Sequence, residues 1–403
     1  MDSSTAAQCQ EVEAAMGGAL RLAALTGCRA HERCTGPQIR KMWQTRPEVY
    51  GATERVSLVS SFMASLLIGG YACIDQTDGA GMNIMDIATR QLREDALQAM
   101  APGLEERIGK LAPAHAVSGK IAPYFVQRFQ FASSCLVIQW SGDNPNSLAG
   151  LTLSNPGDLA ISLGTSDTVF GVTDSPEPTL EGNIFPNPVD PKTYIVLLCY
   201  KNGSLTREDL RNHYAERSWD IFNRLLEETS PLNGGRLGFY YKEHEILPPL
   251  PEEEVDEFDP ASEVRAIIEG QFLSMRGHAE QCGLPVPPKR IIATGGASSN
   301  PTILKIMASI FGCSVYTSQR SDSASLGAAL RAAHGWLCNQ QDEFVSFSNV
   351  YSGRDDGSSL SMKLAVPFGD CKRDTELLNS YTLLVKKRME IEQKLIERFS
   401  QRE

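Results

Sequence analysis

The chain has 403 residues, a formal net charge of −11 and 42% hydrophobic residues. This length exceeds the usual size of a single hydrophobic core, so we expect two domains. The acidic balance supplies no extended basic surface, which argues against nucleic acid or an anionic membrane as a partner and favours a small-molecule substrate.

Ten cysteines are scattered from Cys9 to Cys371. They form no C-x-x-C pair and no Cys/His spacing typical of metal ligands, which argues against a zinc site and against a disulfide framework. The N-terminal residues do not resemble a secretory leader, and no apolar run approaches the roughly 20 residues of a membrane span. We therefore expect a soluble, cytoplasmic protein. The sequence leaves its oligomeric state open.

The first 130 residues predict mainly helices. The apolar spacing indicates a helix over 5–25 that is interrupted at Gly17-Gly18, and a second helix that Gly36-Pro37 opens. Residues 55–67 favour a buried helix, with a strand as the alternative, and 75–83 a loop; two weaker helices are expected at 89–109 and 121–130. Arg33 lies in the loop before the second helix, where position alone predicts a solvated arginine or a surface ion pair.

Two polar turns follow the ends of buried strands in the middle of the chain. The first, Ser141-Gly142-Asp143-Asn144, comes after an apolar strand and before Pro145, a residue suited to the first turn of a helix. Asp143 there suits either a general base or a helix N-cap. The second turn, in 162–168, bends the chain between two strands, and its backbone N–H groups and hydroxyls can hold a phosphate. A base beside such a hairpin suggests phosphoryl transfer to a hydroxyl.

The C-terminal half predicts alternating strands and helices. We expect a strand at 194–200, a long helix over 204–228, an exposed acidic loop at 247–260 and a helix from Pro260 to about Cys282 that Asp259 caps. Trp219, on the long helix, suits a core position or a ligand-lining one.

Residues 290–316 read as a strand, a glycine turn, a helix and a strand, with Gly295-Gly296-Ala297 and then Asn300 in the turn. Such a turn binds ligands in open α/β sheets, or is simply a tight connection. The helix over 323–337 has a face of small residues that a neighbouring helix or a ligand ring can approach. The amphipathic segment 374–402 is expected to cover its domain.

Several motifs together resemble the FGGY family of carbohydrate kinases, which includes glycerol, gluconate and xylulose kinases, and the chain is most similar to xylulose kinases of the animal type. The motifs are Glu32-Arg33-Cys34-Thr35-Gly36-Pro37, Ser141-Gly142-Asp143-Asn144-Pro145, Ser162-Leu163-Gly164-Thr165-Ser166-Asp167-Thr168, Lys201-Asn202-Gly203-Ser204-Leu205 and Ala293-Thr294-Gly295-Gly296-Ala297-Ser298. The resemblance covers essentially the whole chain. It implies an α/β protein with the actin-like ATPase (ribonuclease H-like) fold, in which a sugar-binding domain (1–157) and a nucleotide-binding domain (158–403) flank a cleft.

The resemblance also implies an activity, the transfer of the γ-phosphate of ATP to D-xylulose. Asp143 would accept the proton of the attacking hydroxyl, while Arg33 and Asn144 would bind the sugar. Gly164 and Thr165 would hold the terminal phosphates.

The adenosine pocket would include Gly295, Gly296, Ala297 and Asn300, with Trp219 near the base. Mg²⁺ is the expected charge-neutralising ion, and no residue of this chain is assigned to it as a ligand.

The chain departs from the family pattern at its start. The family has a first hairpin with an aspartate for the Mg²⁺–phosphate site, and a Gln-His-Gly stretch with a sugar-contacting histidine; this sequence contains neither. We therefore expect an incomplete first domain. Two alternatives remain: a truncated, non-catalytic form that binds only nucleotide or a partner, and a kinase for another ketose or polyol.

Overall fold

A computed structural model describes residues 2–251, 253–255, 258–318, 322–351, 361–365 and 371–400. The chain forms two compact units that interleave in sequence. The first comprises 1–154, 174–195 and 321–355, and the second comprises 155–173, 196–320 and 356–403. The domain boundary after residue 157 stays a prediction.

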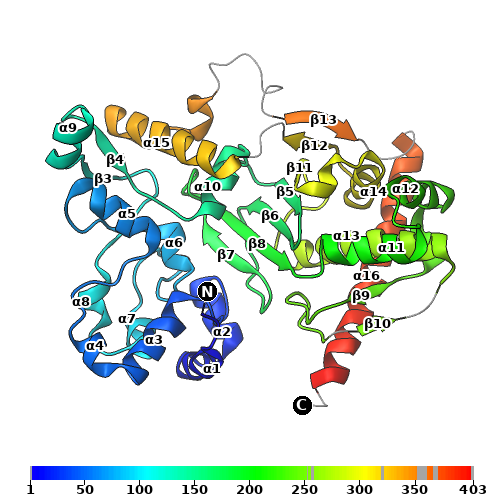
Figure 1. Cartoon of the computed structure of the whole chain (residues 1–403), viewed down its shortest axis with the longest axis horizontal. Coiled ribbons are helices and arrows are strands. Elements are labelled where there is room, and N and C mark those ends of the chain that lie inside the picture. Colours follow the sequence, from blue (N-terminus) through cyan, green and yellow to red (C-terminus); the bar gives the residue numbers. More distant parts are fainter. Residues whose placement is uncertain are drawn as a thin grey trace. The chain divides into compact units, whose positions relative to one another are not determined.

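The first unit is mainly helical (Figure 1). Its helices are α1 (Ala6–Ala15), α2 (Ala19–Thr26), α3 (Thr35–Thr45), α4 (Pro47–Gly51), α5 (Val59–Ile68), α6 (Gln76–Ala80), α7 (Glu94–Met100), α8 (Leu104–Ile108), α9 (Pro123–Phe129), α10 (Asp143–Gly150), α15 (Ser323–Gln341) and the short 3-10 helix η3 (Phe347–Val350). Its strands are β1 (Ile74–Asp75), β2 (Leu111–Ala112), β3 (Val117–Lys120), β4 (Leu136–Ile138) and β7 (Asn183–Pro186). Strand β1 pairs with β2 in parallel, and β3 pairs with β4 antiparallel.

The predicted break in the first helix is confirmed. Helix α1 ends before Gly17, and α2 begins after Gly18. Gly18 has φ +110°, a backbone conformation that glycine adopts readily. Val12 and Leu22 then contribute to a buried core together with Met82 and Met100. The turn therefore lets both helices place apolar residues in one core.

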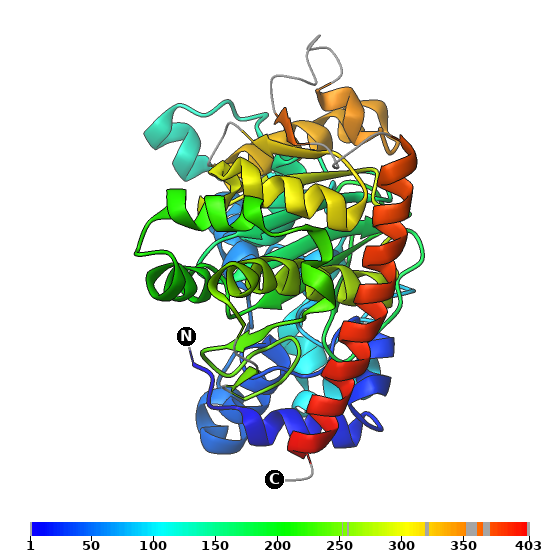
Figure 2. The ribbon, with the colours of Figure 1, turned by 90° about the vertical axis from the view of Figure 1, so that its right-hand side faces the viewer.

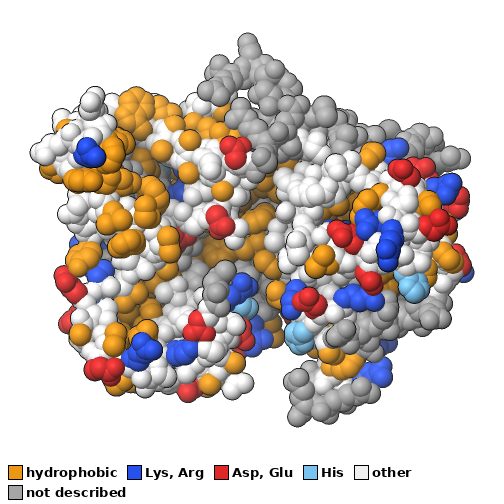
Figure 3. All heavy atoms as spheres, in the orientation of Figure 1, with side chains coloured by type: hydrophobic (Ala, Val, Ile, Leu, Met, Phe, Trp, Pro, Cys, Tyr) orange, Lys and Arg blue, Asp and Glu red, His pale blue; other side chains and the backbone are white. Residues whose placement is uncertain are grey.

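The helix predicted within 55–67 is α5, which begins only at Val59, and most of its apolar side chains are not buried. Val59 is 82% exposed and Phe62 52%, whereas Ala64 on α5 is buried against Ile121 and Val137. The apolar residues surround this helix, so its pattern could not indicate which narrow face packs. Figure 3 shows hydrophobic side chains gathered on the surface over the region where Figure 1 places α5 and α9.

Three shorter predictions for this unit need correction or adjustment. The expected loop at 75–83 begins with the end of β1 and contains α6. The helix expected at 89–109 is two helices, α7 and α8, because Gly103 turns the chain with φ +68°. The helix expected at 121–130 is α9.

The second unit is built on a twisted sheet with helices packed against it (Figures 1 and 2). Its strands run in the order β13 (Ser361–Ala365), β12 (Val315–Ser318), β11 (Arg290–Thr294), β5 (Asp158–Leu163), β6 (Asp167–Thr173) and β8 (Tyr194–Tyr200, whose first two residues belong to the first unit). Strand β11 is parallel to both β12 and β5, while β5 and β6 form an antiparallel hairpin. The remaining elements are α11 (Ser204–Tyr214), α12 (Trp219–Glu228), the 3-10 helices η1 (Pro231–Gly235) and η2 (Gly296–Ser299), β9 (Phe239–Tyr241), β10 (Glu253–Val255), α13 (Pro260–Gln281), α14 (Pro301–Phe311) and α16 (Cys371–Ser400).

The central predictions for this unit are confirmed. The β5–β6 hairpin, the strand β8 and the β11–η2–α14–β12 unit lie where the sequence places them. The Asp259 side chain accepts a hydrogen bond from the Ser262 amide at 3.1 Å and so caps α13. Helix α16 packs against α13 and α14, so it covers the second unit as expected (Figure 2).

Two predictions for the second unit are wrong. The single helix expected over 204–228 is two helices, because Glu216 (φ +51°) and Arg217 (φ +61°) turn the chain between α11 and α12. The sequence has no glycine or proline at this break, so it could not be predicted from residue type. The acidic segment 247–260 also contains β10, which pairs antiparallel with β9.

The small-residue face of α15 serves a neighbouring helix. A Cβ added to Gly327 would lie 1.6 Å from the carbonyl oxygen of Asn146 on α10, and one added to Gly150 would lie 1.9 Å from that of Ser323. Glycine on both helices therefore lets α10 and α15 approach closely, which decides between the two alternatives that the sequence left open.

Candidate functional site

The turn between β5 and β6 lies against the start of α11 in the second unit. Leu163 and Asp167 face each other at the end of the hairpin, and the Gly164 carbonyl oxygen accepts a hydrogen bond from the Ser204 amide at 2.8 Å. A Cβ on Gly203 would lie 2.6 Å from the Thr165 carbonyl oxygen, so only glycine fits this approach. The hairpin turn and a helix N-terminus therefore meet, and helix N-termini favour anions.

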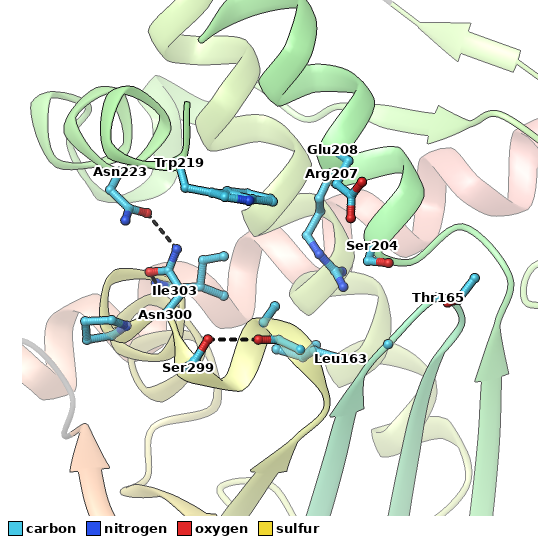
Figure 4. Close-up of a pocket in the computed structure, with 14 residues that line it drawn as sticks. Leu163, Thr165, Ser204, Arg207, Glu208, Trp219, Asn223, Ser299, Asn300 and Ile303 are labelled. Atoms are coloured by element: carbon cyan, nitrogen blue, oxygen red, sulfur yellow. Dashed lines mark hydrogen bonds between the residues drawn. The ribbon is translucent and has the colours of Figure 1, made fainter. Parts of the chain in front are cut away.

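A cavity of about 660 Å³ opens beside this turn (Figure 4). Its volume lies within the range of about 300–1,000 Å³ that is typical of small-molecule sites. Its walls come from the hairpin, from α11 and α12, and from the glycine turn after β11; they are formed by Leu163, Gly164, Thr165, Ser204, Arg207, Glu208, Trp219, Asn223, Gly296, Ala297, Ser299, Asn300, Pro301 and Ile303. The structure thus brings five of the sequence-predicted nucleotide residues and Trp219 to one cavity.

Trp219 is half-buried at the first turn of α12, and Figure 4 shows its indole ring extending toward the middle of the cavity. The ring packs edge-on against Phe222, with 5.2 Å between centroids, and the Arg211 guanidinium lies 4.7 Å from its centroid. These two contacts hold a flat aromatic surface in one orientation. The structure therefore favours the ligand-lining alternative over a core position for Trp219.

Asn300 fixes the glycine turn on the opposite wall. Its side-chain oxygen accepts hydrogen bonds from the Thr302 amide at 3.0 Å and the Ile303 amide at 3.3 Å, which caps α14. Its amide nitrogen donates to Asn223 on α12 at 2.7 Å. The side chain thereby joins α12 to the start of α14 at one side of the cavity (Figure 4).

The two adjacent glycines of this turn have different roles. Gly295 adopts φ +81°, and a Cβ there would lie 2.4 Å from the Leu163 carbonyl oxygen, so it allows the turn to pack on β5. It is adjacent to the cavity but is not one of its lining residues. A Cβ on Gly296 would meet nothing within 4 Å, so that residue faces open space in the cavity.

A buried ion pair anchors the hairpin to α11. Both Arg207 and Asp167 are at most 1% exposed in their side chains; Arg207 Nη1 donates to Asp167 Oδ2 at 2.6 Å and Nη2 donates to Oδ1 at 3.0 Å. Arg207 Nη1 also donates to Gln271 at 2.8 Å. Burial raises the pKa of Asp167, although Arg207 acts in the opposite direction.

Eight cavity residues were not among the predicted site residues, and four of them come from α11 and α12: Ser204, Arg207, Glu208 and Asn223. These four lie on two helices that the sequence predicted as one, so their approach to the strand ends could not be foreseen. The Asn202-Gly203 turn directly before Ser204 was the one local signal, since it marks where a strand ends and a helix begins.

The second group of predicted site residues lies in the first unit, where Asp143 is the first residue of α10. The N-cap is Gly142, and no side chain caps this helix, so the N-cap alternative for Asp143 is wrong. Asp143 is exposed, and its Oδ1 accepts a hydrogen bond from the Asn144 amide at 2.9 Å. An exposed carboxylate at a helix N-terminus can accept a proton from a bound hydroxyl.

Arg33 and Asn144 are also exposed. Arg33 lies in the loop before α3, and its amide donates to His31 Nδ1 at 3.2 Å. Within the described residues, no hydrogen bond or ion pair joins Arg33 to Asp143 or Asn144. Their shared role in binding a sugar stays a prediction.

The described residues contain no group of three His, Cys, Asp or Glu side chains suited to hold a metal ion. No helix within the described ranges is both long and apolar enough to cross a membrane. Nine of the ten cysteines lie in the part of the chain whose side chains are described, and none of these nine forms a disulfide; Cys371 lies outside it.

Comparison with known proteins gives matches along most of the chain. The profile of the N-terminal domain of the FGGY family of carbohydrate kinases matches residues 1–150, and that of the C-terminal domain matches residues 159–336. Xylulose kinase 2 of Arabidopsis thaliana is 62% identical over 418 residues, covering 99% of this chain and 74% of that protein. The xylulose kinase of Mus musculus is 50% identical over 344 residues, covering 83% of this chain and 62% of that protein.

Solved structures support the same fold. A xylulose kinase from Rhodospirillum rubrum superposes with a TM-score of 0.81 at 17% identity, covering 98% of this chain and 78% of that one. A glycerol kinase from Plasmodium falciparum, solved with ADP, gives a TM-score of 0.76 at 14% identity over 96% of this chain and 78% of that one. The predicted actin-like, two-domain fold is confirmed.

Proposed function

Because the chain belongs to the FGGY family of carbohydrate kinases, we propose that it transfers the γ-phosphate of ATP to D-xylulose, giving D-xylulose 5-phosphate and ADP. The observation that carries this proposal is Asp143, an exposed carboxylate at the first residue of α10 that does not cap the helix. The names of the relatives support D-xylulose as the substrate. The cytoplasm is the proposed location.

Asp143 acts as the general base in this proposal. It accepts the proton of the 5-hydroxyl as the oxygen attacks the γ-phosphorus, so no free alkoxide has to form. Arg33 and Asn144 donate hydrogen bonds to other oxygens of the sugar and orient the hydroxyl. Orientation of this kind supplies much of the rate in phosphoryl transfer, where the protein forms no covalent bond to the substrate.

The cavity of the second unit fits a nucleotide. Its volume, its fixed indole ring and the open space at Gly296 suit an adenosine group. The hairpin amides at Gly164 and Thr165, beside the start of α11, suit phosphate oxygens. Mg²⁺, when bound with ATP, would neutralise charge on the phosphates.

The test is ADP release by the purified 403-residue chain, with ATP and Mg²⁺, in the presence and absence of D-xylulose. We expect sugar-dependent ADP release that falls by about 10²–10⁴-fold in Asp143→Asn. Glu94→Gln is the matched control, because Glu94 is another exposed acid in the first turn of a helix of the same unit. Sugar-dependent turnover that survives Asp143→Asn would exclude Asp143 as the base.

The chain spans 62% of the mouse relative and 74% of the Arabidopsis relative, and a non-catalytic form is the alternative that the same assay tests. It predicts nucleotide binding without sugar-dependent ADP release. The same assay with a panel of ketoses and polyols tests the alternative substrates.

A further inference from the structure

A partly buried carboxylate, Asp78 on α6, holds the backbone directly before the candidate base. Its Oδ1 accepts a hydrogen bond from the Gly142 amide at 3.0 Å, and its Oδ2 accepts one from the Ser60 hydroxyl on α5 at 2.6 Å. Both oxygens are therefore engaged and the carboxylate is fixed. Because Gly142 is the N-cap of α10, the bond determines where Asp143 begins the helix.

A second carboxylate, Asp75, accepts a hydrogen bond from Ser141, the residue before Gly142 in the same loop. Asp75 is 1% exposed, and its Oδ2 accepts a hydrogen bond from the Ser141 hydroxyl. Its Oδ1 is buried without a hydrogen-bond partner among the described residues. Two acids from one short segment thus bind two successive residues before Asp143.

One buried arginine faces this acidic cluster from α15. Arg331 is 4% exposed; its Nη1 donates to the Asn146 side chain at 2.8 Å, and Asn146 Nδ2 in turn donates to the carbonyl oxygens of Ser141 (3.1 Å) and Gly142 (2.9 Å). The Arg331 charge lowers the pKa of Asp75 and of Asp78. It does not cancel the effect of burial, which raises the pKa of Asp75 to about 6 and raises that of Asp78 as well.

The charged groups around the loop are therefore few. Asp75 and Asp78 approach it from β1 and α6, and Arg331 approaches it from α15, while Asp143 is the one charged residue of α10 itself. Arg331 interacts with the charges of Asp75 and Asp78, and the nearby Asp143 carboxylate raises the pKa of Asp78. A like charge favours the proton-bound form of a neighbouring carboxylate.

We propose that Asp78 is a positioning residue for Asp143: its carboxylate, itself held by Ser60, fixes the amide that precedes the base. This inference rests on the proposed kinase function for its catalytic meaning. The geometry itself, a carboxylate fixed between Ser60 and the Gly142 amide, is independent of that function.

The variant Asp78→Asn separates charge from geometry. Its side-chain oxygen can still accept from the Gly142 amide, and its amide can donate to the Ser60 hydroxyl, so the loop should keep its shape while the charge is lost. Asp78→Ala removes both. Glu94→Gln is again the control, since it removes one exposed negative charge elsewhere in the same unit.

The first readout is the carboxylate signal of Asp143 in ¹³C NMR spectra of aspartate-labelled full-length chain at pH 7, assigned by its loss in Asp143→Asn. We expect its chemical shift to change more in Asp78→Ala than in Asp78→Asn, because only the alanine variant releases the Gly142 amide, and to stay close to wild type in Glu94→Gln. This measurement needs no turnover, so it tests positioning even if the chain proves inactive. An unchanged signal in Asp78→Ala would overturn the proposal.

The second readout is kinetic and applies when the wild-type chain shows sugar-dependent ADP release. In Asp78→Asn, which keeps the hydrogen bond from the Gly142 amide, we expect kcat within a few-fold of wild type. In Asp78→Ala, we expect kcat to fall by about 10–100-fold with KM for ATP unchanged, because the base is no longer held in place. Wild-type kcat in a folded Asp78→Ala chain, checked by circular dichroism, would refute positioning. Absence of activity in the wild type would count against the proposed function alone.

Discussion

Replacing Arg207 by methionine should destabilise the second unit, because it leaves the Asp167 carboxylate buried without its partner. Asp167 is completely buried, and the two charge-assisted hydrogen bonds from Arg207 are lost together. Removal of one member of a buried ion pair typically costs about 3–5 kcal/mol. We expect the free energy of unfolding at pH 7, measured by urea titration with circular dichroism, to fall by this amount.

The pH dependence of this loss gives a second, independent check. Arg207 lowers the pKa of Asp167, so its removal lets burial raise that pKa further above the unfolded value. A carboxyl group with a raised folded-state pKa is favourable below its unfolded pKa, and that contribution disappears as pH rises through the folded pKa. The deficit of Arg207→Met relative to wild type should therefore shrink as the pH is lowered from 7 toward 4.

Two controls make the result specific. The double variant Asp167→Leu/Arg207→Met should recover much of the lost stability, since no unpaired charge remains buried. Lys242→Met breaks an exposed ion pair with Asp209, at 37% and 56% side-chain exposure, and should cost at most about 1 kcal/mol. If Arg207→Met costs no more than Lys242→Met, or if its deficit grows at low pH, the ion pair does not anchor the hairpin as argued.

Two further predictions concern close backbone approaches. Gly295→Ala should lower the free energy of unfolding by more than about 1 kcal/mol and weaken ATP binding in a fluorescence titration. The reason is that Gly295 has φ +81° and that a Cβ there would lie 2.4 Å from a carbonyl oxygen of β5. In the control Gly296→Ala, the added Cβ would meet no atom within 4 Å, so the free energy of unfolding should stay unchanged. Gly327→Ala should lower the free energy of unfolding by several kcal/mol or abolish folding, because the added Cβ would lie 1.6 Å from the Asn146 carbonyl oxygen. In the control Gly51→Ala, the added Cβ would meet no atom within 4 Å, so the free energy of unfolding in the same urea titration should hardly change. Wild-type stability in either tight-site variant would show that the backbones separate at little cost.

Local signals in the sequence determined several element ends and the central motifs. The Asp259 cap of α13, the Asn300-Pro301 start of α14 and the β5–β6 turn each depend on residues a few positions apart. Hydrogen bonds and backbone conformations of this range are set by residue type alone, so they could be predicted. The family motifs then indicated Asp143 and the hairpin as the places where chemistry would occur.

Only the tertiary structure decided which faces are buried and which charges meet. Val59 is exposed although it lies on a helix that was expected to be buried. The chain also turns at Glu216 and Arg217, between α11 and α12, although neither residue is a glycine or a proline. Burial depends on what packs against a surface, and apolar residues on every side of a helix do not identify that partner.

The side-chain contacts that hold the two candidate sites, an ion pair in one and a hydrogen bond in the other, join residues far apart in the chain. Arg207 meets Asp167 across 40 residues, and Arg331 meets Asn146 across 185. No local pattern records such pairings, since each depends on where whole helices lie once the core has formed. The sequence therefore determined where Asp143 and the hairpin turn occur, and the tertiary structure decided which buried charges fix them.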